Sequence, residues 1–179
     1  QAKYQEGLAL SLAKNPSEAV SAFEELVHFR ENAGIVDEAR VSGLLGKARA
    51  LYQKKDWDGA IEAYREVPVD TLAWHDTLFE SSWAMLRSGR FRSALSNFQS
   101  LHSSFYEDFY LPESLLLRSI VYLYICKYSE MEKVLNLFNK IYRPVYKSIK
   151  KNLENEKDSV KLFNEVVKVM RDYKVKGEE

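Results

Sequence analysis

The sequence contains a single cysteine, Cys126, among its 179 residues. One thiol cannot form a disulfide within the chain, which excludes a small secreted domain held together by disulfides and leaves the compartment open. Cys126 lies in the aromatic segment VYLYICKY, and no base is apparent near it in the sequence. We therefore expect a buried, unreactive thiol rather than a nucleophile.

Net charge and long apolar runs are also missing. Basic residues number 26 and acidic residues 26, so the formal net charge is zero, and no overall field attracts nucleic acid or anionic lipid. No apolar run approaches the roughly 18 residues needed to cross a bilayer. Because the chain begins at Gln1 rather than at a methionine, we expect a piece of a longer or processed protein. Its localisation stays open between the periplasm or cell envelope and the cytoplasm.

The motifs of catalysis and of metal or nucleotide binding are absent from the sequence. His28, His75 and His102 are scattered, without the spacing of a His-Glu-x-x-His or Cys-x-x-Cys metal site. The glycines are isolated and form no phosphate-binding loop. We therefore expect no enzyme, no cofactor and no metal site, and a catalytic role would require a domain outside this segment.

What the sequence does contain is a repeat. Ala60 and Tyr64 recur as Ala94 and Phe98, a spacing of 34 residues. Each unit consists of two runs with apolar residues at helical spacing, joined by a short polar or glycine-containing turn. A period of this length is typical of stacked helical hairpins.

A set of two small residues and one large residue, spaced by twelve and then four positions, marks each unit. The matching sets are Gly7/Ala19/Phe23, Ala48/Ala60/Tyr64, Ser82/Ala94/Phe98 and, weakly, Ser119/Met131/Leu135. Small residues at paired positions let two antiparallel helices approach closely, while the large residue fills the space one turn further on. We predict an array over residues 1–142, with units at about 3–30, 37–69, 71–105 and 111–142.

After Arg143-Pro144 the sequence becomes rich in lysine. Phe163, Val166 and Met170 fit a helical stripe, so we predict that residues 143–179 form a C-terminal helical cap with a frayed end. From Lys140 onward there are eleven basic and seven acidic residues. A mildly basic, solvated surface explains this excess, whereas a membrane-surface or nucleic-acid helix needs a denser basic face.

The repeat resembles the tetratricopeptide repeat, a helix-turn-helix unit that stacks into a right-handed superhelix. The resemblance covers about residues 3–142 and rests on the residue sets above and on the turn segments KKDWDGAIEAY and RSGRFRSALSNF. It implies an all-α fold, an α-α superhelix or solenoid of about four helical hairpins followed by a C-terminal capping helix. The chain departs from the family pattern at Leu44, Leu78 and Leu115, which replace an early aromatic residue.

The resemblance implies binding rather than catalysis. Such arrays usually present a concave groove, lined by the first helix of each hairpin, to a peptide or helix of another protein. Some members grip a terminal carboxylate there with basic and amide side chains, but here the equivalent positions are mostly apolar or aromatic, with two arginines. The predicted groove residues are Leu45, Arg49, Tyr52, Phe79, Trp83, Leu86, Arg87, Leu116, Ile120 and Leu123.

The aromatic stripe of this predicted groove has two interpretations. In the first, it is a binding surface for an apolar or amphipathic partner segment, because aromatic residues edged by arginine are typical binding anchors. Alternatively, it is covered by packing between adjacent hairpins or by the C-terminal helix folding back, because large exposed apolar patches are rare on monomers.

The sequence therefore supports two hypotheses for the function. The first is a non-catalytic scaffold or adaptor that binds a protein or peptide partner, with no nucleic acid and no membrane span in this segment. The second is a structural or assembly component of the bacterial cell envelope, because the units resemble those of periplasmic repeat lipoproteins. The oligomeric state is not determined by the sequence.

Overall fold

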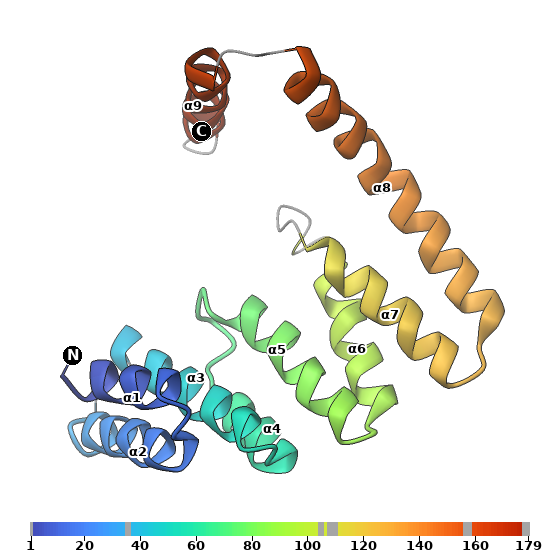
Figure 1. Ribbon diagram of the computed structural model, residues 1–179. Coiled ribbons are helices and arrows are strands. Elements are labelled where there is room, and N and C mark those ends of the chain that lie inside the picture. Colours follow the sequence, from blue (N-terminus) through green and yellow to red (C-terminus); the bar gives the residue numbers. More distant parts are fainter. Residues whose placement is uncertain (1, 35–36, 104–105, 107–110, 156–158, 177–179) are drawn as a thin grey trace.

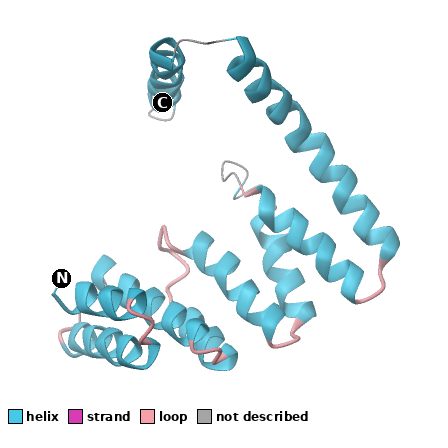
Figure 2. Cartoon of the chain, in the orientation of Figure 1, coloured by secondary structure: helices cyan, strands magenta, loops and turns pink. Residues whose placement is uncertain are grey.

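A computed structural model describes residues 2–34, 37–103, 106, 111–155 and 159–176. Within these residues, the regular structure is entirely α-helical (Figures 1 and 2). The helices are α1 (Ala2–Leu12), α2 (Pro16–Asn32), α3 (Glu38–Gln53), α4 (Trp57–Arg65), α5 (Trp74–Arg87), α6 (Phe91–Leu101), α7 (Pro112–Tyr124), α8 (Tyr128–Asn155) and α9 (Ser159–Lys176). The all-α fold predicted from the sequence is confirmed. The last residues of the predicted frayed end, 177–179, lie outside the described residues.

The helices pack in chain order as hairpins. The hairpins are α1/α2, α3/α4, α5/α6 and α7/α8, and each packs on the next through α2 on α3, α4 on α5, and α6 on α7. Figure 1 shows the resulting row of helix pairs, with α1 at one end and α7 with the first half of α8 at the other. This is the hairpin array expected from the 34-residue spacing.

Each hairpin turn has the same backbone geometry. The second residue after the first helix takes a positive φ, at Lys14, Lys55, Gly89 and Cys126. The next amide then donates to a carbonyl five residues earlier, which satisfies one of the free acceptors at the helix end. These bonds are Asn15 to Leu10 (2.9 Å), Asp56 to Leu51 (3.0 Å), Arg90 to Met85 (2.8 Å) and Lys127 to Tyr122 (2.8 Å). The recurrence includes the fourth hairpin, whose side-chain pattern is degenerate.

The helix starts follow local sequence signals. The Asp37 and Asp56 side chains accept hydrogen bonds from the amides of Arg40 and Gly59, both at 3.0 Å, and so cap α3 and α4. Proline occupies the first position of α2 and of α7, where its missing N–H has no helical partner to lose.

The first core layer is organised around Phe23, whose side chain is 1% exposed. Its ring lies against two glycine backbones, Gly7 of α1 and Gly46 of α3. A Cβ added at Gly7 would meet the ring at 2.6 Å, and one at Gly46 would meet it closer still. In the next two hairpins the positions equivalent to Ala19 and Phe23 also hold buried residues. These are Ala60 with Tyr64, and Ala94 with Phe98.

One expectation from the sequence differs from the structure. Cys126 is exposed rather than buried, because it occupies the positive-φ position of the α7/α8 turn instead of a helix face. The boundary predicted between residues 142 and 143 falls inside α8, which continues through Pro144. Figure 1 shows the second half of α8, and α9, projecting away from the array rather than lying across its end.

A search of the described helices for one long and apolar enough to cross a membrane finds none.

The packing of Phe23 yields a stability prediction. Gly46→Ala should lower the free energy of unfolding by about 1–3 kcal/mol, because the buried ring must move to admit the methyl group. Gly43→Ala is the matched control, because it brings the same gain in helix propensity with a milder steric conflict. A Cβ added at Gly43 would lie 3.0 Å from its nearest neighbour, Val27 Cγ2, which is farther than the Phe23 ring would lie from a Cβ added at Gly46. Urea unfolding of both variants checks this. Equal stability of the two would show that Phe23 does not require the glycine.

The hairpin turn yields a second prediction. Lys55 has φ of 67°, a conformation that is unfavourable for a residue with a Cβ atom. Lys55→Gly should therefore raise the free energy of unfolding by about 0.5–1 kcal/mol. Lys54→Gly, at φ of −66°, should lower it by a similar amount. Thermal and urea unfolding provide the measurement, and a loss of stability in both variants would contradict the assigned turn geometry.

Candidate protein-binding groove

A pocket of about 480 Å³ lies between α3 and α5, the first helices of the second and third hairpins. The pocket is therefore on the surface where the resemblance places a groove. Four of the ten predicted groove residues line it, together with two others. The lining residues are Arg49, Tyr52, Tyr64, Glu80, Trp83 and Arg87.

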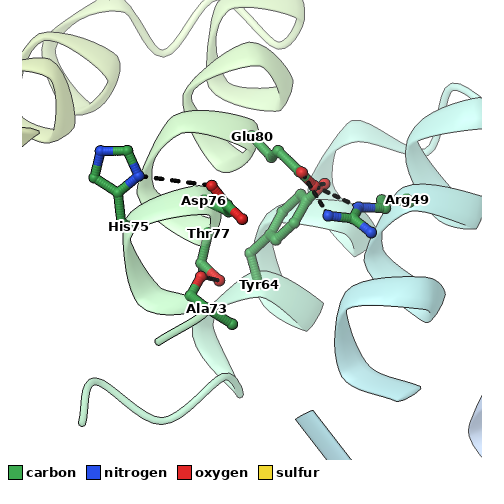
Figure 3. A network of polar contacts seen from close by, with 7 residues as sticks. All are labelled: Arg49, Tyr64, Ala73, His75, Asp76, Thr77 and Glu80. Atoms are coloured by element: carbon green, nitrogen blue, oxygen red, sulfur yellow. Dashed lines mark hydrogen bonds and ion pairs between the residues drawn. The ribbon is translucent and has the colours of Figure 1, made fainter. Parts of the chain in front are cut away.

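An ion pair joins the two helices at this pocket. The Arg49 guanidinium donates from Nε and Nη2 to the two carboxylate oxygens of Glu80, at 2.8 and 2.7 Å. Tyr64, from α4, donates its hydroxyl hydrogen to Glu80 Oε2 at 3.0 Å. Figure 3 shows the Glu80 carboxylate between the guanidinium and the phenol ring. Two-point pairing of this kind fixes the relative orientation of the two groups, so α3, α4 and α5 are held together beneath the pocket.

The network changes the titration of its members. The hydrogen bonds from the Arg49 guanidinium to Glu80 raise the pKa of Arg49, which therefore stays charged. Burial raises the pKa of Tyr64 strongly, and the neighbouring Glu80 charge raises it further. The Arg49 charge is thus neutralised within the fold. Arg87, which is exposed at the end of α5, has no acidic partner within 4 Å in the described part of the chain.

Aromatic side chains provide the rest of the pocket wall. Tyr52 packs edge-on against Trp57, with ring centroids 4.9 Å apart, and both Tyr52 and Trp83 are half-buried against the core. Each ring is therefore held by the fold on one side and accessible on the other.

The other six predicted groove residues lie elsewhere. Leu45 is a core residue with 8% exposure, and Phe79 and Leu86 are half-buried against the core. None of these three side chains lines the pocket between α3 and α5. Leu116, Ile120 and Leu123 are on α7, where they are 40%, 44% and 50% exposed, and none of them lines the pocket between α3 and α5.

Two pocket residues were not among those predicted. Tyr64 was assigned only to the interior of its hairpin, yet its hydroxyl reaches Glu80. Glu80 was overlooked, although a signal was present: it is a carboxylate three residues before Trp83, on a stripe that otherwise reads as apolar. Residues three apart in a helix share a face, so Glu80 was a candidate for the same surface.

Comparison with known families supports this architecture. Residues 43–68 match a family model described as a tetratricopeptide repeat, and this range includes most of α3 and all of α4. This match supports the resemblance found in the sequence, over the unit that contains α3 and α4. Such repeats generally form non-catalytic protein-interaction modules. A search of curated proteins found no match.

The raised pKa of Tyr64 yields a pH prediction. Folding favours the neutral phenol, so this contribution to stability is complete below the ordinary tyrosine pKa of about 10 and is lost as the pH rises above it. Wild-type protein should therefore lose more stability between about pH 9 and pH 11 than Tyr64→Phe, which lacks the ionisable group. Urea unfolding across this range is the measurement. Tyr146→Phe, which changes an exposed tyrosine, is the control and should follow the wild type. Parallel losses in all three proteins would contradict the assignment.

Proposed function

We propose that this protein is a non-catalytic scaffold that binds a segment of a partner protein in the pocket between α3 and α5. The observation that carries the proposal is that half-buried Tyr52 of α3 and half-buried Trp83 of α5 line the same pocket as the exposed Arg87. Tryptophan, tyrosine and arginine are the residue types that dominate binding energy at protein interfaces.

The polar network beneath the pocket supports this function by fixing its shape. Arg49 and Glu80 come from different hairpins, and their two-point pair with the Tyr64 hydroxyl restrains the separation of α3 and α5. A surface that is already ordered loses less entropy when a ligand binds. The pocket therefore suits an extended or helical segment that offers an apolar anchor residue.

The charge of the pocket limits which partner segments it can bind. Because Glu80 neutralises Arg49, Arg87 is the one cation without an acidic partner among the described residues that line the pocket. One acidic group next to the apolar anchor would complement it, whereas a polyanion such as nucleic acid would require many cations. The absence of catalytic activity in this segment is part of the same proposal.

The alternative is that the protein is an assembly component of the bacterial envelope. That role would use the same pocket in a particular compartment, and the geometry described above does not favour it over a scaffold elsewhere. The division of the chain into an array, 1–142, and a C-terminal segment, 143–179, likewise stays a prediction.

The pocket can be tested by substitution. Trp83→Ala and Arg87→Glu should each reduce the recovery of pocket-dependent partner proteins at least tenfold in affinity capture with quantitative mass spectrometry, because each removes a central contact. Arg87 is exposed, so Arg87→Glu should leave the melting temperature within a few degrees. Leu72→Ala, at a side chain that is 95% exposed and outside this pocket, is the control. Unchanged recovery of every partner by both variants would refute the pocket as the binding site.

A further inference from the structure

Residues 137–153 of α8 carry apolar side chains that the array leaves partly exposed. Figure 1 shows the second half of α8 extending past the start of α7. The exposed fractions are 38% for Leu137, 44% for Ile141, 38% for Val145, 63% for Tyr146, 52% for Ile149 and 61% for Leu153. Spacings of three and four residues place these side chains on a common half of the helix.

Part of this apolar surface is hollowed. A pocket of about 510 Å³ lies between α7 and α8, and its apolar wall combines residues of both helices. The wall is formed by Pro112, Leu116, Phe138, Tyr142, Tyr146 and Ile149. Leu116 was predicted to line the main groove, but it lies at this second pocket instead.

The same stretch of α8 is strongly basic. Residues 137–153 contain five basic residues, Lys140, Arg143, Lys147, Lys150 and Lys151, and no acidic residue. Arg143 lines the pocket itself. Helical periodicity places Lys150 along the edge of the apolar surface on which Arg143 lies. It places Lys151 on the side of α8 opposite the pocket. The charge is denser here than the C-terminal composition suggested, because the acidic residues of that region lie after residue 153.

We propose that the α7/α8 pocket and the adjoining face of α8 bind an acidic amphipathic helix of a partner protein. Its apolar residues would occupy the pocket and the stripe that continues to Ile149 and Leu153. Its carboxylates, on the flank of that stripe, would pair with Arg143 and would compete for Lys150 with Glu154, whose Oε1 lies 3.7 Å from Lys150 Nζ. This is the helix-in-groove mode of recognition, with charge selecting the partner.

Other occupants fit these observations less well. The hollow lies between two helices, and Pro112 and Glu113 at the start of α7 form one side of it. A flat bilayer could contact the exposed stripe of α8 but would leave the hollow between the two helices unfilled. The helix α9, from the same chain or from a second copy, would be repelled by the basic side chains of α8. Residues 159–176 contain five basic and two acidic residues, so α9 is itself positively charged.

Selection from a peptide library tests the proposal on the whole chain. The library would display helices with fixed leucines on one face and randomised residues on the flanks. We expect enrichment of glutamate and aspartate. Selected peptides should bind at least tenfold more weakly to Arg143→Glu and to Ile149→Ser, and binding should weaken between 50 and 300 mM salt because the charge pairs are exposed.

Matched variants separate this site from the main groove. Lys151→Glu makes the same kind of charge change on the far side of α8 and should alter affinity less than twofold. Trp83→Ala should leave peptide binding unchanged, so failure of the groove proposal would not affect this result. Circular dichroism of each variant would establish that the helices are intact.

Several results would overturn the proposal. These are no enrichment above the Ile149→Ser background, enrichment of lysine and arginine, or equal weakening by Lys151→Glu and Arg143→Glu. Binding to phosphatidylglycerol vesicles without peptide selection would assign the face to lipid. Self-association in sedimentation velocity, abolished by Arg143→Glu and not accompanied by peptide selection, would assign it to a second copy.

Discussion

The close approach of helices at small residues is the constraint on which the rest of the structure depends. Phe23 fills the space between α1 and α3 because Gly7 and Gly46 have no side chains to exclude its ring. In the later hairpins Ala60 with Tyr64, and Ala94 with Phe98, are likewise buried. This packing sets how far apart consecutive first helices lie, and so sets the width of the groove between them.

The pocket between α3 and α5 is connected directly to that packing. Tyr64 is a core residue of the second hairpin, yet its hydroxyl donates to Glu80 of the third. The Glu80 carboxylate in turn holds Arg49. The surface on which Tyr52 and Trp83 lie is therefore supported by the core. The exposed face of α8 instead combines a hollow that it shares with α7 with a high density of positive charge.

Much of the fold was predictable because it is encoded locally. The spacing of small and large residues predicted four hairpins, and the structure has a helix pair at each. The groove was predictable only in part. Arg49, Tyr52, Trp83 and Arg87 do line one pocket, but Leu45, Phe79 and Leu86 pack into or against the core. A first helix in such an array has neighbours on several sides, and apolar periodicity alone does not distinguish the side that faces solvent. The predicted burial of Cys126 was wrong for a related reason. The apolar run in the sequence continues past Tyr124, where α7 ends, so it does not mark the end of the helix.

The sequence by itself determined the helices, their pairing and the turns between them, because these depend on side chains within one hairpin and on hydrogen bonds that span five residues. Only the tertiary structure decided that Glu80 meets Arg49 and Tyr64, and that the second half of α8 extends beyond its neighbour. Those outcomes depend on the angle between adjacent hairpins and on where α7 begins relative to α8. Both are set by the packing of whole helices, which no local pattern of residues specifies.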